Sequence, residues 1–163
     1  MGKRILIMGA GAVGAYVGGY MARRGEDVIF VDPWAEHVDA INRDGLTLSG
    51  LTDVECFNTP ARAITLTHVQ ALKRERAIDI AFICVKSYDT GWATMLVRDY
   101  LAPTGFVVSL QNCINEETIA DVVGWGRTTG CIAAKIAVEL TGPGKVARGV
   151  PLGGNKHTVF RVG

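Results

Sequence analysis

The sequence predicts an α/β fold built on a doubly wound, mostly parallel sheet, with an antiparallel hairpin near the C-terminus. Short apolar runs alternate with segments of helical periodicity along most of the 163 residues, which is typical of βαβ units. These runs are apolar throughout, as expected when helices cover both faces of a sheet. After Gly130 the pattern changes, and two β-like segments flank the turn-forming residues 141–144, which predicts the hairpin.

The individual elements follow from periodicity, in chain order. We expect strands over 4–8, 28–31, 46–48, 54–57, 78–85, 106–110 and 157–162, and hairpin strands over 131–140 and 145–148. We expect helices over 12–24, 35–43, 68–75, 88–100 and 114–123. Gly25 is expected to close the first helix, and Asn112 or Asn115 to cap the last.

Composition narrows the class of protein. Seventeen Lys and Arg against sixteen Asp and Glu give a net charge of +1, without the basic excess of a nucleic-acid binder. The length predicts one domain over 1–163. The four cysteines form no C-x-x-C pair and stand apart from the histidines, so we expect reduced thiols, no metal site and a cytoplasmic protein. The uncharged stretch 5–22 resembles a signal peptide or membrane span, but its five glycines disfavour both.

The segment Gly9-Ala10-Gly11-Ala12-Val13-Gly14 fits the pattern G-x-G-x-x-G between a predicted strand and a predicted helix. In this pattern the first glycine allows a tight turn, the second lets a pyrophosphate approach the backbone, and the third lets the helix pack closely on the sheet. Free N–H groups at the helix start attract phosphates. The motif therefore predicts a Rossmann-type dinucleotide site that uses all six residues. The alternative is a glycine-rich turn that serves packing alone.

Asp32 follows the second predicted strand, 18 residues after Gly14. A carboxylate at this place accepts hydrogen bonds from the adenosine ribose hydroxyls and repels a 2′-phosphate. The next basic side chain is Arg43, so the sequence favours NAD over NADP. In the alternative, Asp32 only caps the following helix. Because other Rossmann ligands use similar loops, FAD and S-adenosylmethionine stay open.

Two polar residues follow other buried strands, at the sheet edge where ligands of open α/β folds bind. Lys86 can pair with a carboxylate or phosphate, and Asn112, after Gln111, can donate to and accept from a carbonyl or carboxamide. The alternatives are a solvated lysine at a strand end and an asparagine that caps a helix.

Four segments together resemble the N-terminal domain of the ketopantoate reductase family, the 2-dehydropantoate 2-reductases and related 2-keto acid reductases. They are the glycine loop and the segments 85–90, 110–117 and 139–144. The resemblance covers essentially the whole chain. It implies an oxidoreductase of pantothenate biosynthesis that transfers hydride from NAD(P)H to a small 2-keto acid. It also implies that Lys86 and Asn112 are catalytic residues that contact the cofactor at the nicotinamide and substrate end.

The chain departs from the family pattern in three ways. Family members commonly have glycine in place of Cys113, and many have an arginine and use NADP where this chain has Asp32-Pro33. The Cys113 side chain is expected to narrow the pocket or place a thiol near the nicotinamide, or, alternatively, to be an inert, buried thiol. The family's helical C-terminal domain, which supplies the general-acid lysine and a substrate-binding carboxylate, is missing from these residues. We therefore expect an incomplete enzyme that pairs with that domain or forms a homodimer, or, alternatively, a non-catalytic dinucleotide-binding module that acts with a partner.

Overall fold

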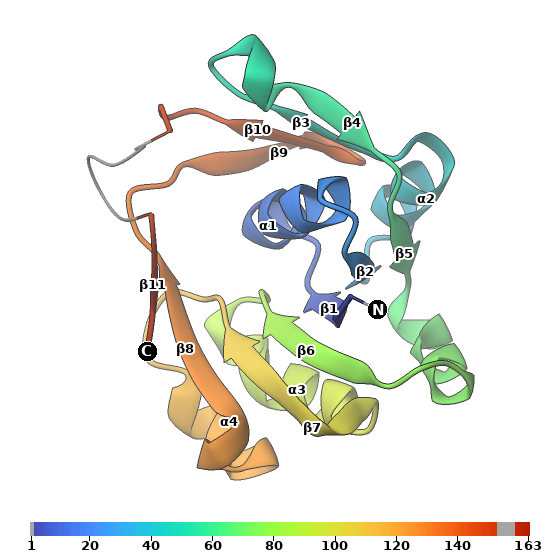
Figure 1. The fold of residues 1–163 in the computed structure, drawn as a ribbon, viewed down its shortest axis with the longest axis vertical. Helices are drawn as coiled ribbons and strands as arrows, with labels where there is room; N and C mark the ends of the chain where they lie inside the picture. The colour runs from blue at the N-terminus through green and yellow to red at the C-terminus, as the bar shows by residue number, and fades with distance from the viewer. Residues whose placement is uncertain (1, 153–158) are drawn as a thin grey trace.

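A computed structural model of the chain describes residues 2–152 and 159–163. Its main element is a seven-stranded sheet with the order β11-β8-β7-β6-β1-β2-β5 (Figure 1). All of its strands run parallel except β11. The bounds are β1 (Arg4–Met8), β2 (Asp27–Val31), β5 (Arg62–Ile64), β6 (Ile78–Ile83), β7 (Leu101–Ser109), β8 (Thr128–Ala133) and β11 (Phe160–Val162).

The parallel strands have the order 3-2-1-4-5-6 of doubly wound dinucleotide-binding folds when they are counted along the chain. The predicted fold class is therefore confirmed. The winding reverses between β1 and β6, which are neighbours: Leu6 pairs with Ala81, and Met8 with Ile83. Ligands of open α/β sheets bind at the carboxyl ends of the strands at such a reversal. The loops that follow β1 and β6 are thus the expected place for a ligand.

Helices cover both faces of the main sheet (Figure 1). The first two, α1 (Ala12–Arg23) and α2 (Ala35–Asp44), lie on one face, and α3 (Thr90–Arg98) and α4 (Glu116–Val123) lie on the other. Gly25 has a φ of 86° after α1, as the predicted C-terminal glycine requires. Within the described residues, no helix has the length and apolar character needed to cross a membrane.

The two faces bury separate apolar cores. Side chains of β1 alternate between them: Leu6 and Met8 belong to one cluster, and Ile5 and Ile7 to the other. Because successive side chains of a strand point to opposite faces, a strand covered on both sides must be apolar at every position. This explains the uninterrupted apolar runs of the sequence.

A second, four-stranded sheet has the order β4-β3-β10-β9 and lies over α1 (Figure 1). In it, β9 and β10 form the predicted antiparallel hairpin, and β10 also pairs with β3 in parallel. A Cβ added to Gly19 of α1 would come within 2.9 Å of side-chain atoms of Leu46 and Leu48, so α1 packs closely against this sheet. The bounds are β3 (Leu46–Ser49), β4 (Phe57–Thr59), β9 (Val138–Gly142) and β10 (Lys145–Arg148).

Two predicted strands have wrong bounds: β4 begins only at Phe57, and the segment 131–140 is divided between β8 and β9. The segment 54–57 overlaps a 3-10 turn, η1 (Asp53–Glu55), because the Glu55 carboxylate accepts hydrogen bonds from the backbone N–H and hydroxyl of Thr52 and closes a capping box. The segment 131–140 is not one strand, because Lys135 has a φ of 54° and interrupts extended structure. The chain there leaves the main sheet at the end of β8 and enters the second sheet at β9.

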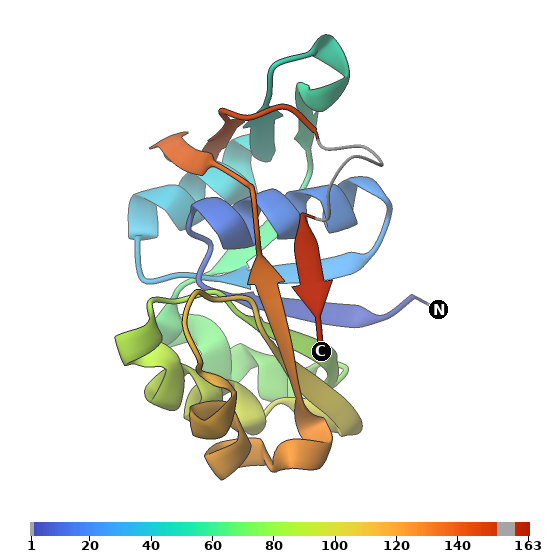
Figure 2. The same cartoon turned by 90° about the vertical axis from the view of Figure 1, so that its left-hand side faces the viewer.

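Other boundaries shift. The predicted helix 68–75 is a longer 3-10 segment, η2 (Leu66–Arg74), and a short 3-10 turn, η3 (Ser87–Asp89), precedes α3. The predicted last strand is seen as β11 beside β8 (Figure 2). Positions 157 and 158 of that prediction lie outside the described residues.

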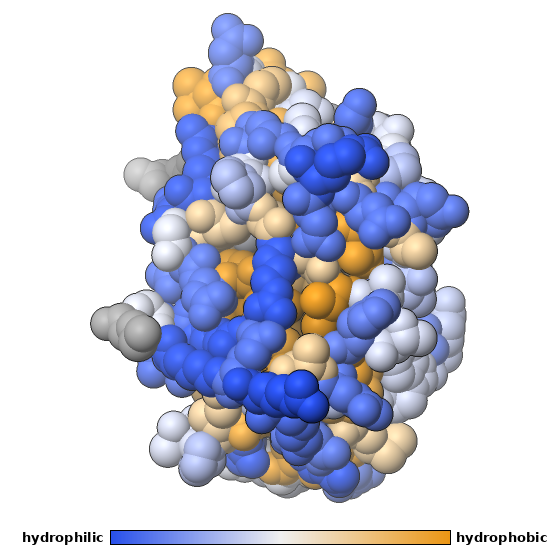
Figure 3. Space-filling model, turned by 90° about the vertical axis from the view of Figure 1, so that its right-hand side faces the viewer, coloured by the Kyte–Doolittle hydropathy of each residue, from blue (hydrophilic) through white to orange (hydrophobic). Residues whose placement is uncertain are grey.

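The face that carries β5 and the N-terminus is mostly hydrophilic (Figure 3). Here the Glu75 carboxylate lies between the guanidinium groups of Arg4 and Arg62, and Arg76 pairs with Asp79. The Arg62 hydrogen bond, with help from Arg4, lowers the pKa of Glu75 to about 2. Arg4 opens β1 and Asp79 is near the start of β6, so this network ties together the ends of the strands opposite the expected ligand edge.

Candidate functional site

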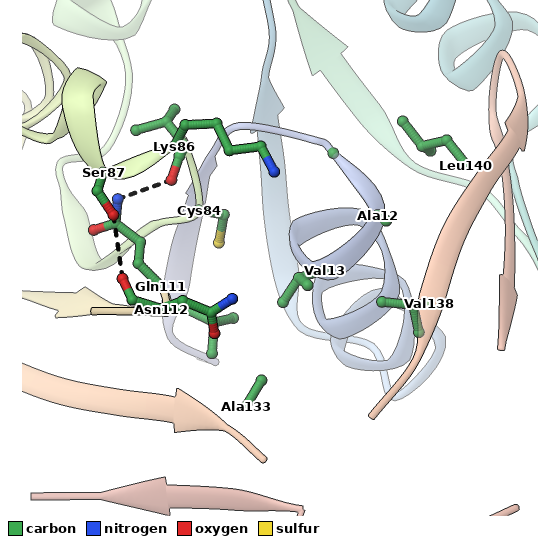
Figure 4. A pocket seen from close by; sticks show the side chains of 13 residues that line it. Ala12, Val13, Cys84, Lys86, Ser87, Gln111, Asn112, Ala133, Val138 and Leu140 are labelled. Atoms are coloured by element: carbon green, nitrogen blue, oxygen red, sulfur yellow. Dashed lines mark hydrogen bonds between the residues drawn. The ribbon is translucent and has the colours of Figure 1, made fainter. Parts of the chain in front are cut away.

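A cavity of about 450 Å³ opens at the carboxyl ends of β1, β6 and β7 (Figure 4). The glycine loop, the loop after β6 and the loop after β7 form three of its walls, and Val138 and Leu140 of the hairpin form another. It therefore brings together Gly11, Ala12, Val13, Lys86 and Asn112, which the sequence predicts as site residues.

A second cavity of about 210 Å³ adjoins the first one. Gly9, Asp32 and Trp92 line it, and it shares Gly11 and Lys86 with the larger cavity. Most of the predicted residues thus line two adjoining cavities, with Asp32 in the smaller one and Asn112 in the larger one, whereas Ala10 and Gly14 line neither.

The three motif glycines meet three different constraints. Gly9 has a φ of 98°, and a Cβ there would lie 3.0 Å from backbone atoms of Cys84 and Val85. A Cβ on Gly14 would lie 2.1 Å from the carbonyl oxygen of Gly9, so close packing of α1 depends on it. A Cβ on Gly11 would meet nothing within 4 Å. The protein itself therefore needs Gly9 and Gly14, whereas the space beside Gly11 is open for a ligand.

The start of α1 faces the larger cavity. Gly11 is the N-cap residue and no side chain caps the helix. The first N–H groups of a helix have no partner within it and carry a partial positive charge. Ala12 and Val13 supply such groups where they line the cavity. The part of the larger cavity beside the start of α1 is therefore suited to an anionic group such as a phosphate.

Asp32 is bonded to the glycine loop. Its Oδ2 accepts a hydrogen bond of 2.8 Å from the Ala10 N–H, and its Oδ1 accepts one of 2.9 Å from the Trp34 N–H. The N-cap position of α2 is Trp34, so Asp32 precedes the cap and orders the turn into the helix. A carboxylate oxygen has more than one acceptor site, which leaves Asp32 able to accept from a ligand as well.

His37 was not among the predicted site residues, but it contacts the same loop. Its ring is fully buried, and Nε2 lies 2.9 Å from the Ala10 carbonyl oxygen. Its Nδ1 accepts a hydrogen bond of 3.0 Å from the Gly144 N–H. The sequence carried no signal for this role, since the partners come from distant segments.

Lys86 stands at the start of η3, is exposed, and extends its side chain toward the glycine loop (Figure 4). The Asn112 backbone carbonyl accepts hydrogen bonds from the Ser87 hydroxyl and the Asn115 amide. The N-cap position of α4 is Asn115, without a capping side-chain bond. The Asn112 side chain therefore does not serve as the helix cap and lines the cavity instead.

Gln111 holds the Lys86 loop in place. Its buried side-chain amide donates hydrogen bonds of 2.8 Å to the Val85 carbonyl and 2.9 Å to the Thr90 hydroxyl, while Ser109 donates to its Oε1. The end of β7 is thereby tied to the loop after β6. The sequence placed Gln111 in a motif without assigning it this role.

The cysteines fall into two kinds. Cys113 is exposed and has a φ of 72°, so the expected buried thiol is wrong, and its side chain is not part of the cavity wall. Cys84 lies in the cavity wall, where burial raises the pKa of its thiol. Among the residues that the structure describes, no three His, Cys, Asp or Glu side chains gather as metal ligands.

Comparison with known proteins gives consistent matches. The family described as ketopantoate reductase PanE/ApbA matches residues 5–158. The 2-dehydropantoate 2-reductases of Pyrococcus horikoshii and Pyrococcus abyssi are 39% and 34% identical over 91% and 98% of this chain. The chain spans about half of these relatives, 46% and 51%.

Solved structures match in the same way. A PanE/ApbA family ketopantoate reductase from Ralstonia eutropha superposes with a TM-score of 0.78 at 32% identity, covering 90% of this chain and 46% of that one. A D-mandelate dehydrogenase in a ternary complex with NADH and anilino(oxo)acetate gives a TM-score of 0.72 over 89% of this chain and 45% of that one. Its identity is 23%, so this likeness concerns the fold alone.

Proposed function

Because the chain belongs to the ketopantoate reductase family, we propose that it is the dinucleotide-binding part of an NAD(P)H-dependent reductase of a small 2-keto acid. The first candidate substrate is 2-dehydropantoate. The observation that carries the proposal is the pair of adjoining cavities at the strand reversal, which share Gly11 and Lys86 and are lined by Asp32 in one and Asn112 in the other.

The residues of these two cavities fit a dinucleotide. The open space at Gly11 and the N–H groups of Ala12 and Val13 suit the pyrophosphate. Asp32 suits the adenosine ribose, and its negative charge disfavours the 2′-phosphate of NADP. We therefore propose NADH as the preferred cofactor.

Asn112 lines the larger cavity and Lys86 lines both cavities, and we propose that the nicotinamide and the keto acid bind between these two side chains. The nicotinamide, when bound, supplies the hydride. The Lys86 ammonium compensates the negative charge of the substrate carboxylate and of the oxygen that develops charge during reduction. The Asn112 amide donates a hydrogen bond that orients a carbonyl or carboxamide. Completion of the reaction also needs a proton donor. We propose that another part of the full enzyme provides it.

The proposal is tested by fluorescence titration of the chain with NADH and NADPH at one salt concentration. NADH is expected to bind more tightly than NADPH. Asp32→Asn is expected to weaken the binding of NADH and so to bring the dissociation constants of the two cofactors closer together. Gly11→Ala places a Cβ where the pyrophosphate is expected, so its NADH dissociation constant should rise at least about tenfold, or about 1.4 kcal/mol. Gly126→Ala is the matched control, because a Cβ there also meets nothing within 4 Å.

Each result has a distinct meaning. Tighter binding of NADPH would contradict the role given to Asp32. Equal binding by wild type, Gly11→Ala and Gly126→Ala would contradict the assignment of the glycine loop. A yellow preparation would point to flavin instead. Turnover of 2-dehydropantoate by the chain alone, at a typical rate of about 1–10³ s⁻¹, would show that no external proton donor is needed.

A further inference from the structure

We propose that His37 is a positioning residue for dinucleotide binding, which fixes the peptide group between Ala10 and Gly11 of the glycine loop and joins it to the turn of the β9–β10 hairpin. The inference rests on the proposed function, since it takes the glycine loop as the phosphate-binding element. It assigns a role to a buried histidine that contacts neither cavity directly.

The two successive peptide groups that flank Ala10 are each held by a hydrogen bond. The Ala10 N–H, in the peptide that joins it to Gly9, donates to Asp32 Oδ2 at 2.8 Å, and the Ala10 carbonyl oxygen, in the peptide that joins it to Gly11, lies 2.9 Å from His37 Nε2. Ala10 stands between Gly9 and Gly11, whose backbones are not restrained by a Cβ. These two hydrogen bonds therefore set the orientation of the loop just before the N-cap of α1, and with it the direction of the first helical N–H groups.

The hydrogen-bond network fixes the chemical form of His37. A backbone N–H can only donate, so the contact from Gly144 makes Nδ1 an acceptor. The proton of the neutral ring is then on Nε2, where it is donated to the Ala10 carbonyl. The ring also stacks on Trp34, with centroids 5.4 Å apart and planes 8° from parallel. Trp34 is itself bonded to Asp32, so Asp32, Trp34 and His37 act as one unit around Ala10.

The same histidine connects the glycine loop to the hairpin that forms one wall of the larger cavity. Gly144, with a φ of 69°, lies in the turn that joins β9 to β10. Strand β9 carries Val138 and Leu140, which line the larger cavity opposite Lys86 (Figure 4). Through His37, the strand that forms this wall is thus tied to the loop expected to bind the phosphates.

Two variants separate positioning from packing. His37→Phe keeps a flat ring beside Trp34 and loses both hydrogen bonds, whereas His37→Gln places a donor near the position of Nε2. Val38→Ala, at the next position of α2, which is also buried, is the matched control. We expect the NADH dissociation constant to rise roughly tenfold in His37→Phe, clearly less in His37→Gln, and not at all in Val38→Ala. All titrations are made well below the melting temperature of each variant.

A measurement without cofactor tests the hydrogen bonds themselves. Long-range ¹H–¹⁵N spectra of the wild-type chain at neutral pH should show His37 as the neutral Nε2–H form, and the Gly144 amide should exchange slowly. A charged ring or an Nδ1–H form would overturn the inference, whether or not the variants fold.

The outcomes distinguish this inference from the proposed function. If the wild-type chain fails to bind NADH, the proposed function fails, and the role given to His37 falls with it. If wild type binds and His37→Phe binds equally well, only the role of His37 is overturned. Equal weakening in His37→Gln and His37→Phe, or weakening in Val38→Ala, would assign the effect to packing and also overturn it.

Discussion

Replacing Cys113 with glycine is expected to stabilise the chain. Cys113 has a φ of 72°, and the left-handed conformation costs an L-residue about 1–2 kcal/mol. Glycine removes this strain but loses more backbone entropy on folding, about 0.5–1 kcal/mol. Because Cys113 is exposed, little packing is lost. The midpoints of these two ranges leave a net gain of about 0.75 kcal/mol, within limits of about 0–1.5 kcal/mol, or roughly 2–3 °C in melting temperature for a chain of this size.

Thermal unfolding followed by circular dichroism, under reducing conditions, measures this gain. Cys113→Ala is the control, because it removes the thiol and keeps the Cβ that causes the strain. We expect Cys113→Ala to melt close to wild type and Cys113→Gly to melt above both. If Cys113→Gly is no more stable than Cys113→Ala, backbone strain at this position is not the reason, and the argument from its φ is wrong.

Three further predictions concern the loops and the ion network. In Gly14→Ala, the new Cβ would be 2.1 Å from the Gly9 carbonyl oxygen, so urea unfolding should show a loss of about 1–3 kcal/mol or more; an unchanged midpoint would contradict this. The pKa of Glu75 is lowered to about 2 by Arg62, so its charge stabilises the fold above about pH 4.5 and that contribution is lost toward pH 2. Glu75→Gln should therefore flatten the fall in melting temperature between these pH values, and parallel curves would argue against it. Gln111→Leu leaves the buried Thr90 hydroxyl and the part-buried Val85 carbonyl without their donor, so urea unfolding should show a loss of about 1–3 kcal/mol, and wild-type stability would refute the role given to this amide.

The sequence predicted the elements whose cause is local. Three predictions of this kind are confirmed: the glycine loop between strand and helix, the glycine after α1, and the strands in the apolar runs. Each depends on the backbone conformation of its own segment, or on an apolar pattern within that segment that matches burial on both faces. The strand predicted over 54–57 was misplaced for a local reason as well, because the capping box of Thr52 and Glu55 outweighs the β propensity of this segment. Nothing in the sequence predicted the break at Lys135, because lysine is not a residue type that favours a positive φ.

The candidate site divides in the same way. The sequence by itself determined which residue types follow β1, β2, β6 and β7, and the order of the parallel strands then places them at one edge of the sheet. Only the tertiary structure decided how they are held. Gly144 and His37 are 107 positions apart, and Gln111 and Val85 are 26 apart. Such hydrogen bonds depend on the packing of whole elements against each other, and no local preference of either partner encodes them.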